Sequence, residues 1–199
     1  MRVFLIIAVV FCLFFLGFQI YASMATEKSN EQPYTVIKVE KDFEIRFYPV
    51  VTMATINSTA KSYKELSSPG FRQLAGYIFG GNSTKQKIAM TSPVHMDIND
   101  SVSSMSFVMP EGNTKDNLPE PNDTKIKISA STAEYVAAIR FGGFASDKKI
   151  EEYTEKLKSA LIAKSYSFYG SFRFLGYNPP FQLWGRRNEI IVSIDYKLK

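Results

Sequence analysis

The stretch Lys87-Ile88-Ala89-Met90-Thr91-Ser92-Pro93-Val94 is the first of two that decide the fold. The second is Gly176-Tyr177-Asn178-Pro179-Pro180-Phe181-Gln182-Leu183-Trp184-Gly185-Arg186-Arg187-Asn188-Glu189, in which Pro180 follows Pro93 by 87 residues. A further correspondence pairs residues 51–56 with residues 135–140, at an offset of 84 residues. These spacings predict a duplicated unit, in which two sheets close around a shared interior and one helix backs each sheet.

The periodicity around these stretches predicts the same order of elements in both halves. In the first half we expect strands at 34–40, 43–48 and 50–56, then a helix that opens at Ser68-Pro69 and ends at Gly80-Gly81. In the second half we expect strands at 125–129 and 135–141, a helix at 147–164, and strands at 172–177 and 189–196.

The two stretches resemble the SOUL haem-binding family, as do Phe107-Val108-Met109-Pro110, Leu118-Pro119-Glu120-Pro121 and Phe141-Gly142-Gly143-Phe144. The resemblance extends from Tyr34 to Tyr196. It implies an α+β fold, namely a pseudo-duplicated and distorted antiparallel β-barrel flanked by two α-helices. This fold is also similar to that of effector-binding domains, which take other flat or cationic ligands. The resemblance further implies haem or a related tetrapyrrole held in a hydrophobic groove, with a ligation mode that varies among members.

We expect this groove between the first helix and the loop that carries two successive prolines, because proline limits the movement of that loop. The candidate binding residues are Phe71, Leu74, Ala75, Tyr77 and Ile78 on the helix, and Pro180, Phe181, Gln182, Leu183 and Trp184 on the loop. Most aromatic residues in such a chain instead pack in the core. Candidate partners for the propionates are Lys64, Arg72, Arg186 and Arg187, although at least one of the last two is expected to fix a turn beside Glu189.

His95 is the single histidine and a candidate axial ligand of iron. In a strand that follows Pro93, Val94 and His95 point to opposite faces, which argues against ligation. We therefore expect haem without a strong protein–iron bond.

The N-terminus predicts export. Arg2 precedes the apolar run from Val3 to Ile20, and small residues around Ala22 and Ala25 resemble a cleavage site, so residues 1–25 are interpreted as a signal peptide. The alternative is an uncleaved signal anchor, the one case in which we expect membrane association. Residues 26–33 form a polar linker and residues 34–199 the haem-binding domain, which we expect to be secreted, luminal or anchored on the non-cytoplasmic side.

Other sequence patterns limit the classes of function that this chain can have. Four sequons, at Asn57, Asn82, Asn99 and Asn122, predict a glycoprotein if their asparagines are exposed. The single Cys12 lies in the apolar run, so the domain that follows has neither a thiolate nucleophile nor a cysteine metal ligand. The net charge of +5 comes from dispersed lysines and arginines, which disfavours nucleic-acid binding.

We therefore expect a monomer that is not an enzyme and that carries or buffers haem. No nucleophile elbow, phosphate-binding loop or cluster of histidines and carboxylates is present in the sequence. The alternative function, from another class, is a protein-interaction module whose groove takes a hydrophobic peptide segment without haem.

Overall fold

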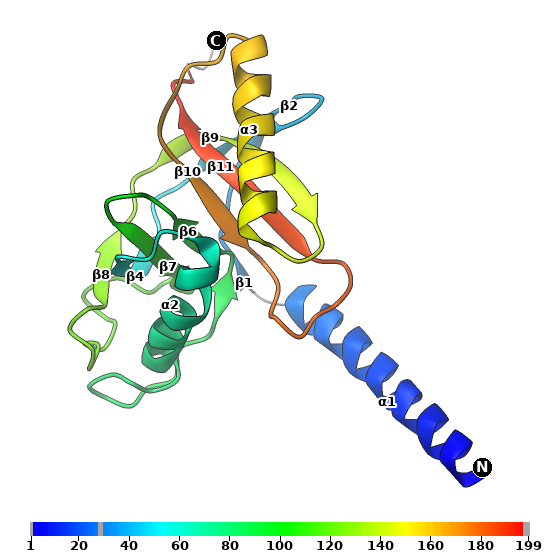
Figure 1. The fold of residues 1–199 in the computed structure, drawn as a ribbon. Helices are drawn as coiled ribbons and strands as arrows, with labels where there is room; N and C mark the ends of the chain where they lie inside the picture. The colour runs from blue at the N-terminus through cyan, green and yellow to red at the C-terminus, as the bar shows by residue number, and fades with distance from the viewer. Residues whose placement is uncertain (1, 28–29, 197–199) are drawn as a thin grey trace.

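A computed structural model describes residues 2–27 and 30–196 of the chain. The described part has an α+β architecture, with one nine-stranded sheet, a separate pair of short strands and three α-helices (Figure 1). The helices are α1 (Arg2–Glu27), α2 (Tyr63–Ile78) and α3 (Asp147–Ala163). The strands of the large sheet are β2 (Thr35–Val39), β3 (Glu44–Tyr48), β4 (Thr52–Ser58), β6 (Val94–Asp97), β7 (Ser103–Val108), β8 (Lys127–Ala130), β9 (Glu134–Gly142), β10 (Phe168–Gly176) and β11 (Arg187–Ile194). The short strands β1 (Asn30–Glu31) and β5 (Thr91–Ser92) pair in parallel.

The sheet confirms the duplicated order of elements but only one of the two predicted correspondences. Its strand order is β2-β3-β9-β11-β10-β6-β7-β4-β8, so that β9-β11-β10 and β6-β7-β4 are mirrored about the contact between β10 and β6. Val51 to Ile56 and Tyr135 to Arg140 fall on the equivalent strands β4 and β9. The proline correspondence is wrong, because Pro93 precedes β6 whereas Pro180 follows its counterpart β10.

The pairings of the large sheet are antiparallel among the described residues, and β2 and β8 stand at its two ends. No described pairing joins these two outer strands. The predicted closed barrel is therefore not seen, and closure stays a prediction.

The two helices cover different halves of the sheet. Helix α2 packs on β4 and β7, whereas α3 packs on β9, β10 and β11, as Figure 1 shows. Ser146 caps α3 by accepting a hydrogen bond from the Lys149 amide, and Leu157 and Leu161 are fully buried beneath it. The prediction for this helix is confirmed to within one residue.

Helix α2 begins earlier than predicted. Its N-cap is Ser62, whose hydroxyl accepts from the Glu65 amide, while the Glu65 carboxylate accepts from the Lys61 amide at 2.9 Å. Pro69 consequently lies inside the helix and not at its first position. The predicted start at Ser68-Pro69 is wrong because the capping residues six positions earlier satisfy the free amides of the first turn.

Apolar residues alternate along the central strands and fill both faces of the sheet. On β9, Ala137, Ile139 and Phe141 belong to the large core beneath the helices, while Val136 and Ala138 belong to a second cluster on the other face. The strands buried on both faces fix the register, because a slip by one residue would exchange the two sets.

A buried ion pair sits beside the second cluster. The Arg46 guanidinium donates to both carboxylate oxygens of Glu189, at 2.7 and 3.2 Å, and Tyr177 donates to the same carboxylate at 2.9 Å. Burial opposes the ionisation of Glu189, but the hydrogen bonds and charges of Arg46 and Arg187 outweigh it and hold the pKa below its ordinary value. This network fixes β3 against β11 through β9.

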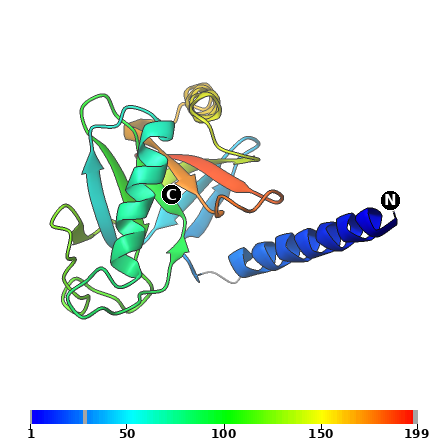
Figure 2. The ribbon, with the colours of Figure 1, turned by 60° about the horizontal axis from the view of Figure 1, so that its bottom comes forward.

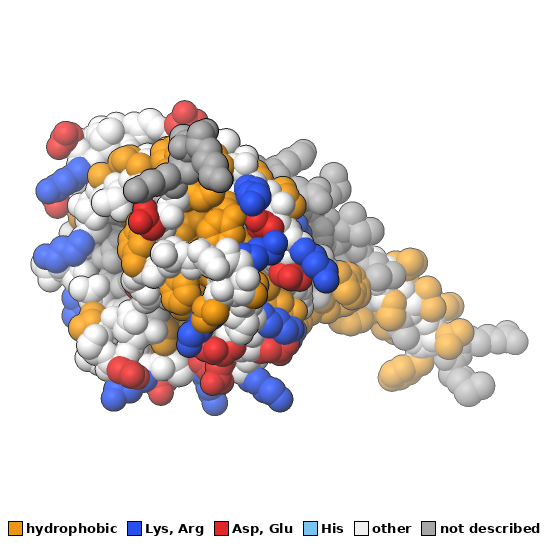
Figure 3. Space-filling view, turned by 90° about the horizontal axis from the view of Figure 1, so that it is seen from above, with side chains coloured by type: hydrophobic (Ala, Val, Ile, Leu, Met, Phe, Trp, Pro, Cys, Tyr) orange, Lys and Arg blue, Asp and Glu red, His pale blue; other side chains and the backbone are white. Residues whose placement is uncertain are grey.

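Helix α1 projects away from the body (Figure 2) and contacts it through Gln19, whose side chain binds the backbone of Phe181 and Leu183. In the view from above (Figure 3), hydrophobic side chains run along α1, whereas charged side chains gather on the body. Counting only residues whose side chains the structure describes, no helix is long and apolar enough to cross a membrane. The predicted cleavage positions at Ala22 and Ala25 lie where side chains are not described.

Candidate functional site

An apolar groove of about 680 Å³ opens on the helical face of the sheet, between α2 and the loop that follows β10. Tyr63, Ser67 and Phe71 of α2 form one wall, and Pro179, Pro180, Phe181 and Arg186 form the opposite one. The floor consists of Val94 and Met96 of β6 together with Phe174 and Gly176 of β10. This volume and apolar lining are those of a site for a small organic ligand.

The α2 wall is held by ring contacts with the sheet. Tyr63 meets Phe174 edge-on at a centroid separation of 5.3 Å, and Phe71 packs on Phe107 at the same separation. Both rings are half-buried, so each presents part of its surface to the groove. The start of α2 at Tyr63, which the early cap dictates, is what places this first turn on the groove.

The opposite wall is the lip loop, residues 177–186, and Arg186 holds it closed. The Arg186 guanidinium donates to the carbonyls of Pro179 at 2.7 Å and Gln182 at 2.6 Å, and lies 4.5 Å from the centroid of the Phe144 ring. Asn178 adds a bond to the Gln182 side chain at 3.0 Å. The loop is therefore pinned by its own hydrogen bonds as well as by proline.

Arg186 is the one cation among the described residues that line the groove. Burial lowers its pKa from the ordinary value, with a smaller opposing effect of Tyr63. Its Nε is buried and without a hydrogen-bond partner. Because its other nitrogens already serve the lip-loop carbonyls, we assign it a positioning role.

Three of the predicted groove residues, Phe71, Pro180 and Phe181, line the groove. Four predicted residues of α2 do not: Leu74, Ala75, Tyr77 and Ile78 are buried against the sheet, and the Tyr77 hydroxyl donates to the Pro119 carbonyl at 3.0 Å. These four are core residues because they lie on the broad apolar stripe of the helix, and that stripe faces the sheet.

The other predicted contacts also lie outside the lining. Lys64 and Arg72 are exposed on α2, and Leu183 and Trp184 are exposed at 39% and 53% on the lip loop. Gln182 is buried and donates to the Trp184 carbonyl at 2.9 Å, so it supports the loop. Arg187 stacks on Tyr177 and pairs with Glu189, which is the structural role that the sequence suggested for at least one of the two arginines.

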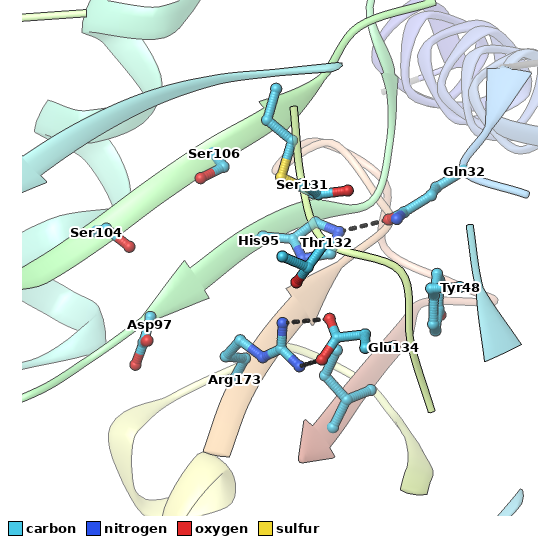
Figure 4. A pocket seen from close by; sticks show the side chains of 12 residues that line it. Gln32, Tyr48, His95, Asp97, Ser104, Ser106, Ser131, Thr132, Glu134 and Arg173 are labelled. Atoms are coloured by element: carbon cyan, nitrogen blue, oxygen red, sulfur yellow. Dashed lines mark hydrogen bonds and ion pairs between the residues drawn. The ribbon is translucent and has the colours of Figure 1, made fainter. Parts of the chain in front are cut away.

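His95 lies on the opposite face of β6 from the groove, as the alternation along the strand predicts. Val94 and Met96 line the groove, whereas His95 lines a separate polar pocket of about 210 Å³. Its Nε2 is 2.6 Å from Oε1 of Gln32 (Figure 4). Burial lowers the pKa of His95 to about 3, so the ring is neutral at physiological pH. From this position it cannot reach an iron in the groove.

The polar pocket is lined by charged side chains that already have hydrogen-bond partners within the protein. Arg173 binds the Glu134 carboxylate through two hydrogen bonds of 2.7 and 2.8 Å, and Asp97 accepts from Ser171 at 2.6 Å, with the pairing of Arg173 visible in Figure 4. Burial opposes the ionisation of Glu134, but Arg173 holds its pKa below the ordinary value. Among the described residues, no group of three or more histidines, cysteines or carboxylates is arranged to hold a metal ion.

The predicted glycan acceptors differ in exposure. Asn57 and Asn122 are exposed and Asn99 is half-buried, but Asn82 is only 1% exposed. The Asn82 side chain donates to the carbonyls of Tyr77 and Gln86, which ties the end of α2 to the following turn. Asn82 is therefore a structural residue in the folded chain, and glycosylation at this position stays a prediction.

Sequence reasoning missed several groove residues, namely Phe18, Tyr63, Ser67, Val94, Met96 and Phe174. The alternation of Val94 and Met96 with His95 and Asp97 was a usable signal for β6. The Ser62-x-x-Glu65 pattern was a usable signal for the first turn of α2.

Comparison with known proteins gives consistent names. A family model described as "SOUL heme-binding protein" matches residues 29–193. Heme-binding protein 1 of Xenopus laevis is 29% identical over 173 residues, covering 81% of this chain and 90% of the relative. Heme-binding protein 2 of Mus musculus is 28% identical, covering 74% of this chain and 76% of the relative.

Among solved structures, the C-terminal domain of EcmrR superposes with a TM-score of 0.59 at 9% identity, over 82% of this chain and 99% of that domain. At this identity the likeness concerns the fold alone.

Proposed function

Because the chain belongs to the SOUL heme-binding family, we propose that its apolar groove binds haem and that the protein carries or buffers this cofactor. Haem binding is supported at the level of the family by the names of the matched relatives. The observation that carries the proposal for this chain is the groove itself, with aromatic walls and a volume of about 680 Å³.

The lining fits a flat, largely apolar ring. Tyr63 and Phe71 on one wall and Phe181 on the other offer ring surface, and the two prolines keep the lip loop in place before a ligand arrives. Covering about 300 Å² of ring at about 25 cal/mol per Å² would stabilise a complex by about 7.5 kcal/mol before the costs of association. Apolar contact then supplies most of the affinity.

We propose that binding needs no strong protein–iron bond. His95 faces the polar pocket, and the Tyr177 hydroxyl is committed to Glu189 at 2.9 Å beside the second cluster. The remaining groove residues of ligating type are Tyr63, Met90 and Met96. The haem group would supply its iron chemistry, while these side chains hold the ring and exclude water from its faces.

The proposed location is the non-cytoplasmic side of a membrane. The charged start at Arg2 and the apolar run that follows it support export, whether the segment is a signal peptide or an anchor. Fusion of residues 1–40 to alkaline phosphatase would give enzyme activity only if this segment directs export, and an inactive fusion would contradict the location.

The proposed ligand is tested by titrating hemin into the full chain and following the Soret absorbance. We expect saturable uptake by the wild type and by Val39→Asp, an exposed position on β2, and strongly weakened uptake by Phe71→Asp, which puts a charge into the groove. Equal uptake by all three proteins would contradict the groove as the site. A wild type that shows no spectral change would contradict haem binding and favour the peptide-binding alternative.

A further inference from the structure

Gln19 of α1 is buried, although the other described side chains of this helix are exposed. It is 2% exposed, whereas Phe14, five residues earlier, is 76% exposed. The Gln19 amide donates to the Phe181 carbonyl at 3.1 Å, and its Oε1 accepts from the Leu183 amide at 3.0 Å. By binding the Phe181 carbonyl and the Leu183 amide, the Gln19 side chain holds two backbone groups of the lip loop and satisfies its own buried amide.

Phe18, the neighbouring residue, belongs to the groove. Its ring centroid lies 5.8 Å from that of Phe181, and it is one of the residues that line the cavity. Gln19 and Phe18 thus make two different contacts with one short piece of the lip loop: the first binds its backbone, and the second packs on its apolar tip.

The matched family region begins at residue 29, so α1 lies outside it. Within the apolar run from Val3 to Ile20, Gln19 is the one strongly polar residue, and it stands where it meets the lip loop. A removable leader needs only a hydrophobic middle of 7–15 residues. The function of a removable leader does not require the Gln19 side chain to form hydrogen bonds with the lip loop.

We propose that the N-terminal helix is retained in the working protein and completes the ligand groove, with Gln19 fixing the lip loop and Phe18 forming its outer wall. Cleavage after Ala22 or Ala25 would remove both contacts. The role of Phe18 rests on the proposed haem site, whereas the Gln19 contact is independent of any ligand. Bound ligand then leaves the groove past Phe18, so this residue slows its release.

The contact of Gln19 is tested by hydrogen exchange of the Leu183 amide in the full chain in detergent micelles. The variant Gln19→Leu keeps the apolar helix and removes the amide, and the amide of Val192 in the core serves as an internal reference. We expect Leu183 to exchange about tenfold faster in Gln19→Leu, with Val192 unchanged. Equal exchange of Leu183 in both proteins would overturn the proposal.

The role of Phe18 is tested by the rate of hemin transfer from the full chain to excess apomyoglobin. We expect Phe18→Ala to release hemin about three- to tenfold faster. Phe14→Ala removes the same ring from the same helix and is the matched control. It should match the wild type because Phe14 is exposed and does not line the groove. Equal rates for the two variants would overturn the groove role of α1. A wild type that takes up no hemin would contradict the proposed function. Hydrogen exchange of the Leu183 amide would still test the contact between Gln19 and the lip loop. An intact mass that lacks the first 22 or 25 residues after export would also overturn retention.

Discussion

Replacing Arg186 by lysine separates the two roles that an arginine at the groove can have. The guanidinium donates to the carbonyls of Pro179 and Gln182 at 2.7 and 2.6 Å, so its planar fork clamps the lip loop. Lysine keeps the positive charge but replaces the fork by a single ammonium group. If Arg186 acts as a clamp, lysine fails to replace it; if it acts as a charge for a ligand carboxylate, lysine succeeds.

The size of the effect follows from the bonds that are lost. A hydrogen bond from a charged group contributes about 1.5–3 kcal/mol, and Arg186→Lys loses one of the two short bonds, or about 2 kcal/mol of loop stability. Since 1.4 kcal/mol corresponds to a factor of ten, haem affinity should fall by about 30-fold if binding requires the closed lip loop. Arg186→Met loses both bonds and should fall further.

The assay is hemin titration of the folded variants, with urea unfolding as a check on stability. Arg72→Met is the matched control, because Arg72 is an exposed arginine on α2 that does not line the groove, and its affinity should stay within about twofold of the wild type. Wild-type affinity in Arg186→Lys would refute the clamp, and a large loss in Arg72→Met would show that the ligand lies elsewhere.

Three further predictions concern buried polar groups. His95 has a folded pKa of about 3, below its ordinary value of 6.5, so the unfolded chain takes up the proton first as the pH falls. The free energy of unfolding should therefore decrease as the pH drops below about 6.5. Urea unfolding at several pH values should show this decrease in the wild type and a smaller one in His95→Gln. Arg46→Met leaves the Glu189 carboxylate with fewer partners and should lower the free energy of unfolding by about 3 kcal/mol. This loss should be smaller at low pH, where the carboxylate is protonated. A loss below about 1 kcal/mol in urea unfolding would contradict the ion pair as described. In a glycosylating host, peptide mapping should find no glycan on Asn82, in contrast to the exposed Asn122, and an occupied Asn82 would show that this turn is not packed as in the structure.

The sequence predicted those parts of the fold that local patterns determine. Helix α3 was correctly bounded because Ser146 provides a cap and Leu157 and Leu161 recur on one face. The separation of Val94 from His95 was correct because side chains alternate strictly along a strand. The start of α2 was misplaced because Pro69 resembles a first-turn proline, whereas the capping residues at Ser62 and Glu65 begin the helix.

The site was harder to predict because a groove depends on which flank of a helix remains open. The apolar stripe of α2 marks Leu74 and Ile78 for the core, and nothing in that pattern distinguishes core from groove. Tyr63 and Ser67 are only half-buried on the same helix, and they line the groove. Contacts between distant segments, such as that of Gln19 with Phe181, have no local signature at all.

The most direct test of the haem groove is to map a bound tetrapyrrole on the protein by NMR, with zinc protoporphyrin as a diamagnetic probe and amide shifts as the readout. We expect the largest shifts at Phe71, Met96, Gly176 and Phe181, which surround the groove, and much smaller shifts at His95. Shifts centred on His95 and the polar pocket, or no shifts at saturating probe, would contradict haem binding in the groove.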